Sequence, residues 1–405
     1  MKYLILVPDG CGDWPLPLLT GKTPLEAADI PHADALARAG LVGLVRTIPE
    51  GISPGSDAAN LSILGYDPAV HLTGRASLEA AAMGLAMAQT DTAFRVNLLT
   101  LAGDGPYEEL RVQDHSAGNI GGDEAAELIS AINHELGSDM LRFYPGVGYR
   151  CLMIAKALGE GCTLTPPHDI LDQPTGAHLP RGGDGETLRN LMIRSHALLS
   201  RHPVNLRRAA LGLPPANSIW FWGAGKKPAL PSFAERRGVR GSVITAVNLI
   251  KGIGLCAGLL PVDVPGADGT IDTNYAGKAL AAIHEFQRGQ DFVFVHVEGP
   301  DECSHSGDLD GKLRALSLID EHILGPLAHW LAHSGEPYRI LLLPDHKTPL
   351  KTRTHCAEPV PFVLFDSEVR LSPNIKNAFS EAAGAEGRFF ESGGDLADYF
   401  FRKPV

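Results

Sequence analysis

The feature of this sequence that most restricts its fold is a set of short runs with the character of buried strands, of which the continuously apolar Tyr3–Val7 and the mostly apolar 291–298 (DFVFVHVE) are the clearest. A strand that is apolar on both faces is typical of a parallel sheet covered by helices on both sides. The elements expected to alternate with these runs are helices at 31–40 and about 310–334 and strands at 42–48 and 338–343. This alternation predicts an α/β fold with a doubly wound, mostly parallel sheet.

The middle of the chain follows a different pattern. Residues 94–100 and 107–113 are expected to be strands that pair as a hairpin across 102–105. The further elements expected here are a helix at 123–136, strands at 140–145 and 149–155, a helix at 184–201 and a proline-rich return linker at 202–217. We therefore expect an inserted α+β domain at 73–216, within a core domain made of 1–72 and 217–405.

The composition restricts the partners of the protein. Its 405 residues carry 35 Lys and Arg against 47 Asp and Glu, a net charge of −12, without a long basic run. Nucleic acid and anionic membranes are therefore not expected as partners.

The longest stretch without a charged side chain, 209–225, contains two adjacent prolines and is not expected to span a membrane. The start of the chain reads as a strand rather than a signal peptide. None of the six cysteines forms a CxxC pair, so we expect reduced thiols and a cytoplasmic protein.

Side chains able to bind metal ions gather at four places where strands are expected to end. The candidates are Asp9, Ser56, Asp301 with His305, and Asp345 with His346 followed by His355. In open α/β sheets, functional residues cluster at the carboxyl ends of the strands, so these side chains could converge. Three aspartates and three histidines form a nitrogen and oxygen ligand set that suits Zn²⁺ or Mn²⁺. The number of ligands is sufficient for a two-metal phosphoryl-transfer site.

Taken singly, each place has an ordinary structural explanation. Asp9 could belong to a turn, and Ser56 could cap a helix. Asp301 and His305, four residues apart, could be a local pair on one helical turn. The metal-site hypothesis depends on the joint occurrence of these residues at strand ends.

Ser56 adds a chemical element to this set. It follows a Pro-Gly pair and precedes a run with helical character. A serine at a helix N-terminus lies where free N–H groups and the helix dipole hold anions. Its hydroxyl, if bound to a metal, would lose its proton more easily and could attack phosphorus.

The motifs and their order resemble those of the cofactor-independent phosphoglycerate mutases. The motifs that carry the resemblance are VPDG, PGSDAANLSILGYDP, DHSAGNI, RFYPGVGYR, TPPHDI, LPSFAERRGVRGSVITAVNLIKGIG, PDECSH, LPDH and RTHCAEPVPF, which together extend over nearly the whole chain. The match is closer to the archaeal-type branch of that family, within the alkaline phosphatase superfamily. The chain also resembles a bacterial subgroup proposed to act as a homoserine kinase.

The resemblance implies roles for individual residues. It makes Ser56 the nucleophile and divides the metal ligands into one set of Asp9, Ser56, Asp345 and His346 and another of Asp301, His305 and His355. The groups that would hold or act on the substrate are His115, Arg150, Arg207, Arg208 and the catalytic Lys251. The acid or base for the substrate hydroxyls has no clear counterpart and stays unassigned.

The implied reaction interconverts 3-phosphoglycerate and 2-phosphoglycerate through a phosphoserine, without 2,3-bisphosphoglycerate. It would use two divalent ions, for which Mn²⁺ fits best and Mg²⁺ or Zn²⁺ are alternatives. The inserted domain would hold the glycerate and exclude water. Two alternatives stay open: a homoserine kinase-like phosphotransferase in threonine biosynthesis, and a metal-dependent phosphatase that uses the same site. The oligomeric state is not indicated.

Other classes of protein have weaker support. The chain lacks both a G-x-x-x-x-G-K-[ST] loop and a G-x-S-x-G elbow. A dehydrogenase would use 252–257 (GIGLCA) and Asp272, but this hypothesis explains none of the Asp and His residues. A non-enzymatic binding protein should keep its function after metal is removed.

Overall fold

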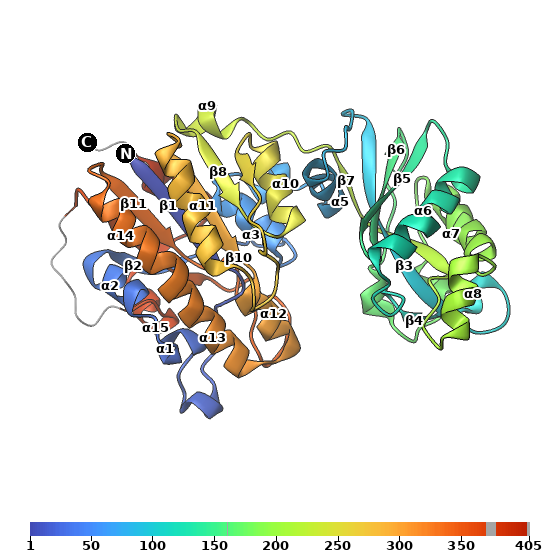
Figure 1. The fold of residues 1–405 in the computed structure, drawn as a ribbon, viewed down its shortest axis with the longest axis horizontal. Helices are drawn as coiled ribbons and strands as arrows, with labels where there is room; N and C mark the ends of the chain where they lie inside the picture. Colours follow the sequence, from blue (N-terminus) through green and yellow to red (C-terminus); the bar gives the residue numbers. More distant parts are fainter. Residues whose placement is uncertain (160, 370–377, 403–405) are drawn as a thin grey trace. The chain divides into compact units, whose positions relative to one another are not determined.

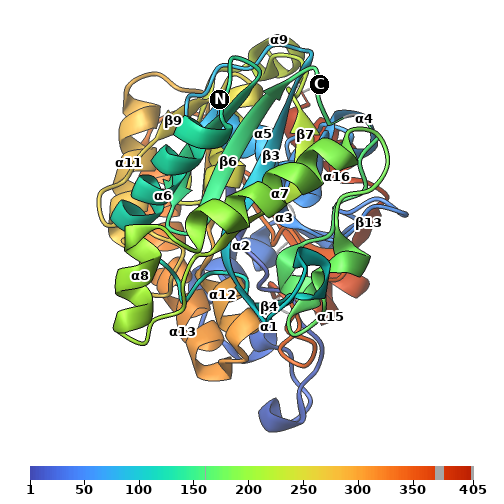
Figure 2. The ribbon, with the colours of Figure 1, turned by 90° about the vertical axis from the view of Figure 1, so that its right-hand side faces the viewer.

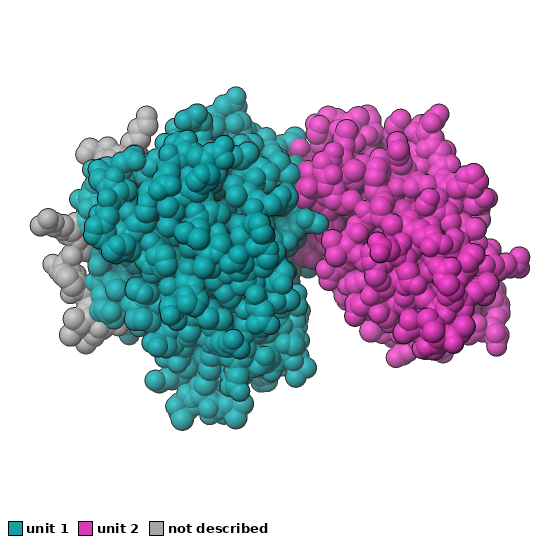
Figure 3. Space-filling view, viewed as in Figure 1, with its two compact units in different colours: residues 1–72, 229–405 teal, residues 73–228 magenta. Residues whose placement is uncertain are grey.

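The computed structural model describes residues 1–159, 161–369 and 378–402. Two compact units are present, one formed by 1–72 and 229–405 (the core unit) and the other by 73–228 (the inserted unit) (Figure 3). The return expected at 217 lies earlier than the observed boundary, because β7 (Ser218–Lys226) still pairs with β3 (Asp91–Ala102) inside the inserted unit. Within the described ranges, no helix has both the length and the apolar character needed to cross a membrane.

The core unit contains an eight-stranded sheet. Its order is β13 (Arg388–Phe390), β2 (Leu41–Val45), β12 (Val360–Asp366), β11 (Tyr338–Leu342), β1 (Lys2–Pro8), β10 (Phe292–Val297), β8 (Gly241–Ile244) and β9 (Leu260–Val262). Among the described strands of this sheet, β12 alone runs antiparallel to its neighbours, β11 and β2. Every residue of β1 and of β10 is buried, as expected for central strands covered on both faces. The predicted α/β fold with a mostly parallel sheet is confirmed.

Helices cover both faces of this sheet. The described helices of the core unit are α1 (Pro24–Ala27), α2 (Pro31–Ala39), α3 (Ser56–Ile63), α4 (Pro68–His71), α9 (Phe233–Arg237), α10 (Asn248–Cys256), α11 (Tyr275–Gln287), α12 (Gly299–Ser306), α13 (Leu309–Ile319), α14 (Gly325–His333), α15 (Glu381–Ala385) and α16 (Gly393–Phe401). Figure 1 shows α11, α13 and α14 in front of the central strands. Alternate strand residues such as Leu4 and Val293 share a buried cluster with these helices. On the other face, α10 packs closely on β8, because a Cβ on Gly254 would lie 2.5 Å from Val243 Cγ1.

Two sequence expectations for the core unit need correction. The helix expected at 310–334 is interrupted by a π-helical turn at Asp320–Leu324, in which the Gly325 N–H bonds the Asp320 carbonyl. Pro326 follows and has no N–H to donate, which favours such a local change of hydrogen bonding. The glycine pattern at 252–257 begins inside α10 rather than in a strand-to-helix turn. The dehydrogenase hypothesis therefore lacks the structural context that it requires.

The inserted unit is an α+β layer structure. Its elements besides β3 and β7 are α5 (Arg75–Ala82), β4 (Arg111–Asp114), α6 (Gly122–Leu136), β5 (Leu141–Val147), β6 (Arg150–Lys156), α7 (Gly185–Leu199) and α8 (Pro203–Ala210). The long strand β3 pairs antiparallel with β4, β6 and β7, and Figure 2 shows α6 and α7 across one face of the sheet. The expected hairpin forms, but its second strand begins at Arg111 because 107–109 is a 3-10 turn. The expected linker at 202–217 contains the helix α8.

Candidate active site

The sheet order explains why ligand-type side chains from distant parts of the chain meet. Strands β10, β1 and β11 are adjacent and parallel, so their carboxyl ends lie at one edge of the sheet. Asp9 follows β1, Asp301 and His305 lie on α12 after β10, and Asp345 and His346 follow β11. Their convergence is therefore a consequence of the parallel register.

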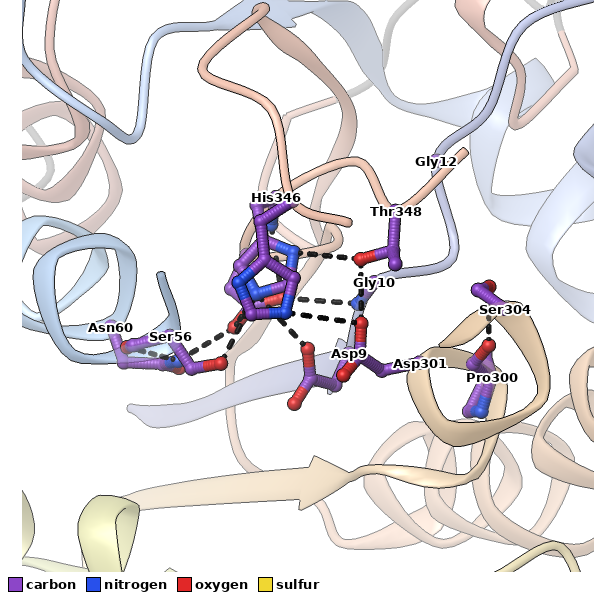
Figure 4. Close-up of polar contacts among 12 residues, drawn as sticks. Asp9, Gly10, Gly12, Ser56, Asn60, Pro300, Asp301, Ser304, His346 and Thr348 are labelled. Atoms are coloured by element: carbon purple, nitrogen blue, oxygen red, sulfur yellow. Dashed lines mark hydrogen bonds and ion pairs between the residues drawn. The ribbon is translucent and has the colours of Figure 1, made fainter. Parts of the chain in front are cut away.

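One group of side chains surrounds the imidazole of His346 (Figure 4). Its Nε2 atom lies 3.5 Å from Asp9 Oδ1 and 3.5 Å from Asp345 Oδ2. The same atom is 3.1 Å from the Oγ atom of Ser56, the first residue of α3. The structure thus brings together Asp9, Ser56, Asp345 and His346.

A second group forms around Asp301. Its Oδ2 atom is 3.1 Å from His305 Nε2, and its Oδ1 atom is 3.7 Å from His355 Nε2. The two histidine Nε2 atoms are themselves 3.0 Å apart. Two imidazole nitrogens and a carboxylate that face one another at these distances can act as ligands of one cation.

Buried carboxylates crowd together in the site, and one of their oxygen atoms lacks a hydrogen-bond donor in the described ranges. Asp9 Oδ1 is buried and makes no hydrogen bond within the described part of the chain. Burial, followed by the charges of Asp345 and Asp301, raises the pKa of Asp9 well above its usual range. Divalent cations would offset this charge, and buried carboxylate and imidazole ligands suit Mn²⁺ or Zn²⁺. Among the described residues, two groups of three side chains each have their ligand atoms within 4.8 Å of one another. They are Asp9, Asp345 and His346, and Asp301, His346 and His355, so His346 belongs to both groups.

The histidines differ in their protonation. A hydrogen bond to Asp301, opposed by partial burial, raises the pKa of His305 to about 9. Burial lowers the pKa of His346, so its imidazole is neutral near pH 7 and able to coordinate a metal. Burial acts to raise the pKa of Asp301, but hydrogen bonds from His305 and His355 outweigh it and lower that pKa well below the usual value.

Three residues that the sequence analysis did not single out also belong to the site. His296 is fully buried on β10 with its Nε2 atom 3.1 Å from Asp9 Oδ2, and burial lowers its pKa to about 4. Asn60 donates to Asp345 Oδ2 at 2.9 Å and to the Ser56 carbonyl at 2.8 Å. Thr348 contacts both groups of ligands. Weak signals exist for two of them, because His296 is the one polar residue within β10 and Asn60 lies one helical turn after Ser56.

The inserted unit brings His115 and Arg150 together around one aromatic ring. The His115 ring lies 5.8 Å from the Tyr149 ring centroid, and the Arg150 guanidinium lies 5.1 Å above the same ring. His168 packs against His115 at 6.1 Å and against Trp222 at 5.1 Å. The two predicted substrate contacts are therefore neighbours on a surface that combines cationic and aromatic groups.

The other basic residues assigned to the substrate lie elsewhere. Arg208 is buried, donates to the Pro214 and Ala117 carbonyls and pairs with Glu124, so its guanidinium is held by three partners within the inserted unit. Arg207 faces Glu127 at 3.5 Å on an exposed helical surface, and none of its contacts within the described ranges leads to His115.

Lys251 lies in the core unit, on α10. Its Nζ atom is 2.6 Å from Asp263 Oδ1. No contact within the described part of the chain joins its ammonium group to the metal-type ligands.

The fold and this cluster define an α/β protein in which carboxylates and imidazoles that could hold a metal ion lie beside a serine. Comparison with known proteins gives the family. The model of the 2,3-bisphosphoglycerate-independent phosphoglycerate mutase family matches residues 37–205. The mutase of that name from Methanothrix thermoacetophila is 49% identical over 389 residues, 96% of each chain, and a probable one from Geobacter sulfurreducens is 49% identical over 393 residues, 97% of this chain and 98% of the other. The structure of the cofactor-independent phosphoglycerate mutase from Thermoplasma acidophilum matches with a TM-score of 0.66 at 28% identity, over 99% of both chains.

The chain belongs to the 2,3-bisphosphoglycerate-independent phosphoglycerate mutase family and is an enzyme of that family. The resemblance inferred from its motifs is confirmed.

Proposed function

We propose that this protein interconverts 3-phosphoglycerate and 2-phosphoglycerate in the cytoplasm, through a phosphoserine at Ser56 and without 2,3-bisphosphoglycerate. The observation that carries the proposal is the position of Ser56. Its hydroxyl stands at the start of α3, 3.1 Å from His346 Nε2, at the edge of a buried cluster of carboxylates and imidazoles. A hydroxyl in this position can be activated as a nucleophile and can receive an anion.

Two divalent cations would be held by the ligands described above, with Mn²⁺ the best fit to the mixed oxygen and nitrogen set. One set would be Asp9, Ser56, Asp345 and His346, and the other Asp301, His305 and His355. Bound there, the cations would supply Lewis-acid stabilisation of the phosphoryl oxygens and lower the pKa of the serine hydroxyl.

The transfer exchanges one phosphoester for another. As the Ser56 Oγ–P bond forms, the serine hydroxyl loses its proton and the bond from phosphorus to the substrate oxygen breaks; the glycerate oxygen leaves with the electron pair and takes up one proton, so that bonds and protons balance, and no residue is assigned to carry the proton between them. The reverse displacement on the other glycerate hydroxyl frees Ser56 again. Asn60 fixes the Ser56 backbone and the Asp345 carboxylate, so the nucleophile keeps its orientation in both steps.

The inserted unit has the chemistry to hold glycerate between the two steps. His115 and Arg150, placed around Tyr149, offer donors and positive charge for a small carboxylate. We assign Lys251 to the phosphoryl group, to balance charge on its oxygens, which requires that its ion pair with Asp263 open or be shared.

The test is an enolase-coupled assay on the purified protein with Mn²⁺ and 3-phosphoglycerate, with released phosphate measured in parallel. The proposal predicts 2-phosphoglycerate without added 2,3-bisphosphoglycerate and little free phosphate. A second assay with ATP and homoserine is run on the same preparation. Phosphohomoserine in the absence of 2-phosphoglycerate would replace the mutase by a kinase, and free phosphate as the main product would replace it by a phosphatase.

A further inference from the structure

Thr348 connects the two groups of metal-type ligands. Its side chain is fully buried. The Oγ1 atom donates a hydrogen bond to Asp301 Oδ1 at 2.5 Å and lies 3.1 Å from His346 Nδ1 (Figure 4). Asp301 belongs to one ligand set of the proposed function and His346 to the other, so a single hydroxyl contacts both.

The donors and acceptors of this bridge determine the tautomer of His346. A threonine hydroxyl has one hydrogen, and an ionised carboxylate can only accept, so that hydrogen points to Asp301. The hydroxyl oxygen must then accept from His346, which places the imidazole proton on Nδ1. The lone pair of His346 is consequently on Nε2, the atom that faces Ser56 Oγ at 3.1 Å.

The backbone of Thr348 is held in place by buried groups. Its N–H donates to the Gly12 carbonyl at 3.1 Å, and its carbonyl accepts from Lys312 Nζ at 3.1 Å. Lys312 is itself fixed by an ion pair of 2.9 Å with Asp13, and both of these side chains are fully buried. The hydroxyl of Thr348 therefore has little freedom to turn away from its two partners.

We propose that Thr348 is a positioning residue that fixes His346 in the Nδ1–H tautomer, aligns Asp301 and thereby couples the two metal sites. The inference rests on the proposed function, because it presupposes that both ligand sets bind cations. Residues that form hydrogen bonds to metal ligands orient those ligands, and their loss typically lowers metal affinity by about 10–100-fold. Since one hydroxyl serves both sets, its loss should weaken both sites together.

The test compares Thr348→Val, which keeps the shape of the side chain and removes the hydroxyl, with Thr348→Ser, which keeps the hydroxyl. The control is Thr175→Val in the inserted unit, where the same change also removes a buried hydroxyl bond, to the Tyr107 carbonyl. Mn²⁺ binding to the full chain is measured from the free Mn²⁺ signal in electron paramagnetic resonance, and folding is checked by circular dichroism. We expect T348V to bind both ions at least 10-fold more weakly, and T348S and T175V to bind within about 3-fold of wild type.

Several results would overturn the inference. They are wild-type Mn²⁺ affinity in T348V, equal losses in T348V and T175V, or failure of T348S to restore binding. Absence of Mn²⁺ binding by the wild-type protein would instead contradict the proposed function itself.

A second measurement needs no variant at Thr348 and stands if T348V does not fold. Long-range ¹H–¹⁵N spectra of the Zn²⁺-loaded wild-type chain with ¹⁵N-labelled histidine show which ring nitrogen carries the proton, with His346 assigned by comparison with His346→Gln. We expect the proton of His346 on Nδ1. A proton on Nε2 would overturn the inference.

Discussion

Replacing Asp9 by Asn tests two expected effects of this carboxylate: it destabilises the metal-free protein, and it binds a metal ion. Without metal, the Asp9 side chain is 3% exposed, and Asp345 and Asp301 place further negative charge beside it. Removing one buried and poorly satisfied charge should stabilise the metal-free protein by about 1–3 kcal/mol. For a unit of this size, about 1 kcal/mol corresponds to roughly 2–4 °C in Tm.

Bound metal should reverse the order of stability of wild type and Asp9→Asn. At a Mn²⁺ concentration a thousand times its Kd, one site adds about 4 kcal/mol to the stability of the wild-type protein. Asp9→Asn removes one carboxylate ligand, so Mn²⁺ should add much less to the free energy of unfolding of this variant. Wild type is therefore expected to be the less stable protein in EDTA and the more stable protein in Mn²⁺.

The pH dependence has a definite sign. Because the pKa of Asp9 is raised in the folded state, the folded metal-free protein binds a proton more tightly than the unfolded chain does. The contribution of Asp9 to stability should rise as the pH falls from 7 toward the usual range of an aspartate, and this contribution should be missing in Asp9→Asn, so the difference in stability between the two proteins should shift in favour of wild type.

Scanning calorimetry in EDTA and in Mn²⁺, at pH 7 and pH 5, measures all of these effects. The control is Asp320→Asn. This buried carboxyl accepts hydrogen bonds from the His32 and Ala33 N–H groups, neither of which belongs to the cluster of metal-type ligands. It should lower stability equally with and without Mn²⁺. A metal-free Asp9→Asn protein that is less stable than metal-free wild type would refute the reasoning.

Three further predictions concern individual residues. Ser56→Ala should lower kcat by at least about 10³-fold, measured in the coupled assay, whereas Ser62→Ala on the same helix should keep most of the activity. Asp301→Ala and His355→Ala should each reduce the bound metal found by elemental analysis, and unchanged stoichiometry in both would remove them from the ligand set. Arg208→Ala should lower the free energy of unfolding in urea by about 2–3 kcal/mol with KM for 3-phosphoglycerate unchanged, and a raised KM in a stable protein would return this residue to the substrate site.

The parts of the fold that could be predicted are those with a strong local pattern. The mostly apolar runs of β1 and β10 predicted buried parallel strands, and the parallel register then explains why Asp9 and Asp301 meet. The end of the inserted unit was harder, because β7 is defined by its pairing with β3, a contact distant in sequence. The three prolines of 202–217 predict a linker, but Pro203 begins the helix α8, since proline is well suited to the first turn of a helix.

Site residues that the sequence did not indicate also depend on contacts between residues distant in sequence. Acidic and histidine residues at strand ends could be recognised. The role proposed for Thr348 depends on a hydroxyl that contacts His346 in its own segment and Asp301 on the distant helix α12, and the second contact has no local sequence pattern. Arg208 shows a related limit, since the sequence places a basic residue near a plausible motif but does not show that its guanidinium is buried against three partners. Sequence patterns indicate which chemistry is available, but only the tertiary contacts show which groups are free to use it.

The central claim, that the phosphoryl group passes through Ser56, is tested most directly by the stereochemistry of the transfer. 3-Phosphoglycerate whose phosphate is made chiral with three oxygen isotopes is converted by the Mn²⁺-loaded protein, and the configuration of the product phosphate is determined. Each in-line displacement inverts the configuration at phosphorus, so transfer to the serine and back predicts overall retention. Overall inversion would show a single direct transfer and would contradict the phosphoserine mechanism.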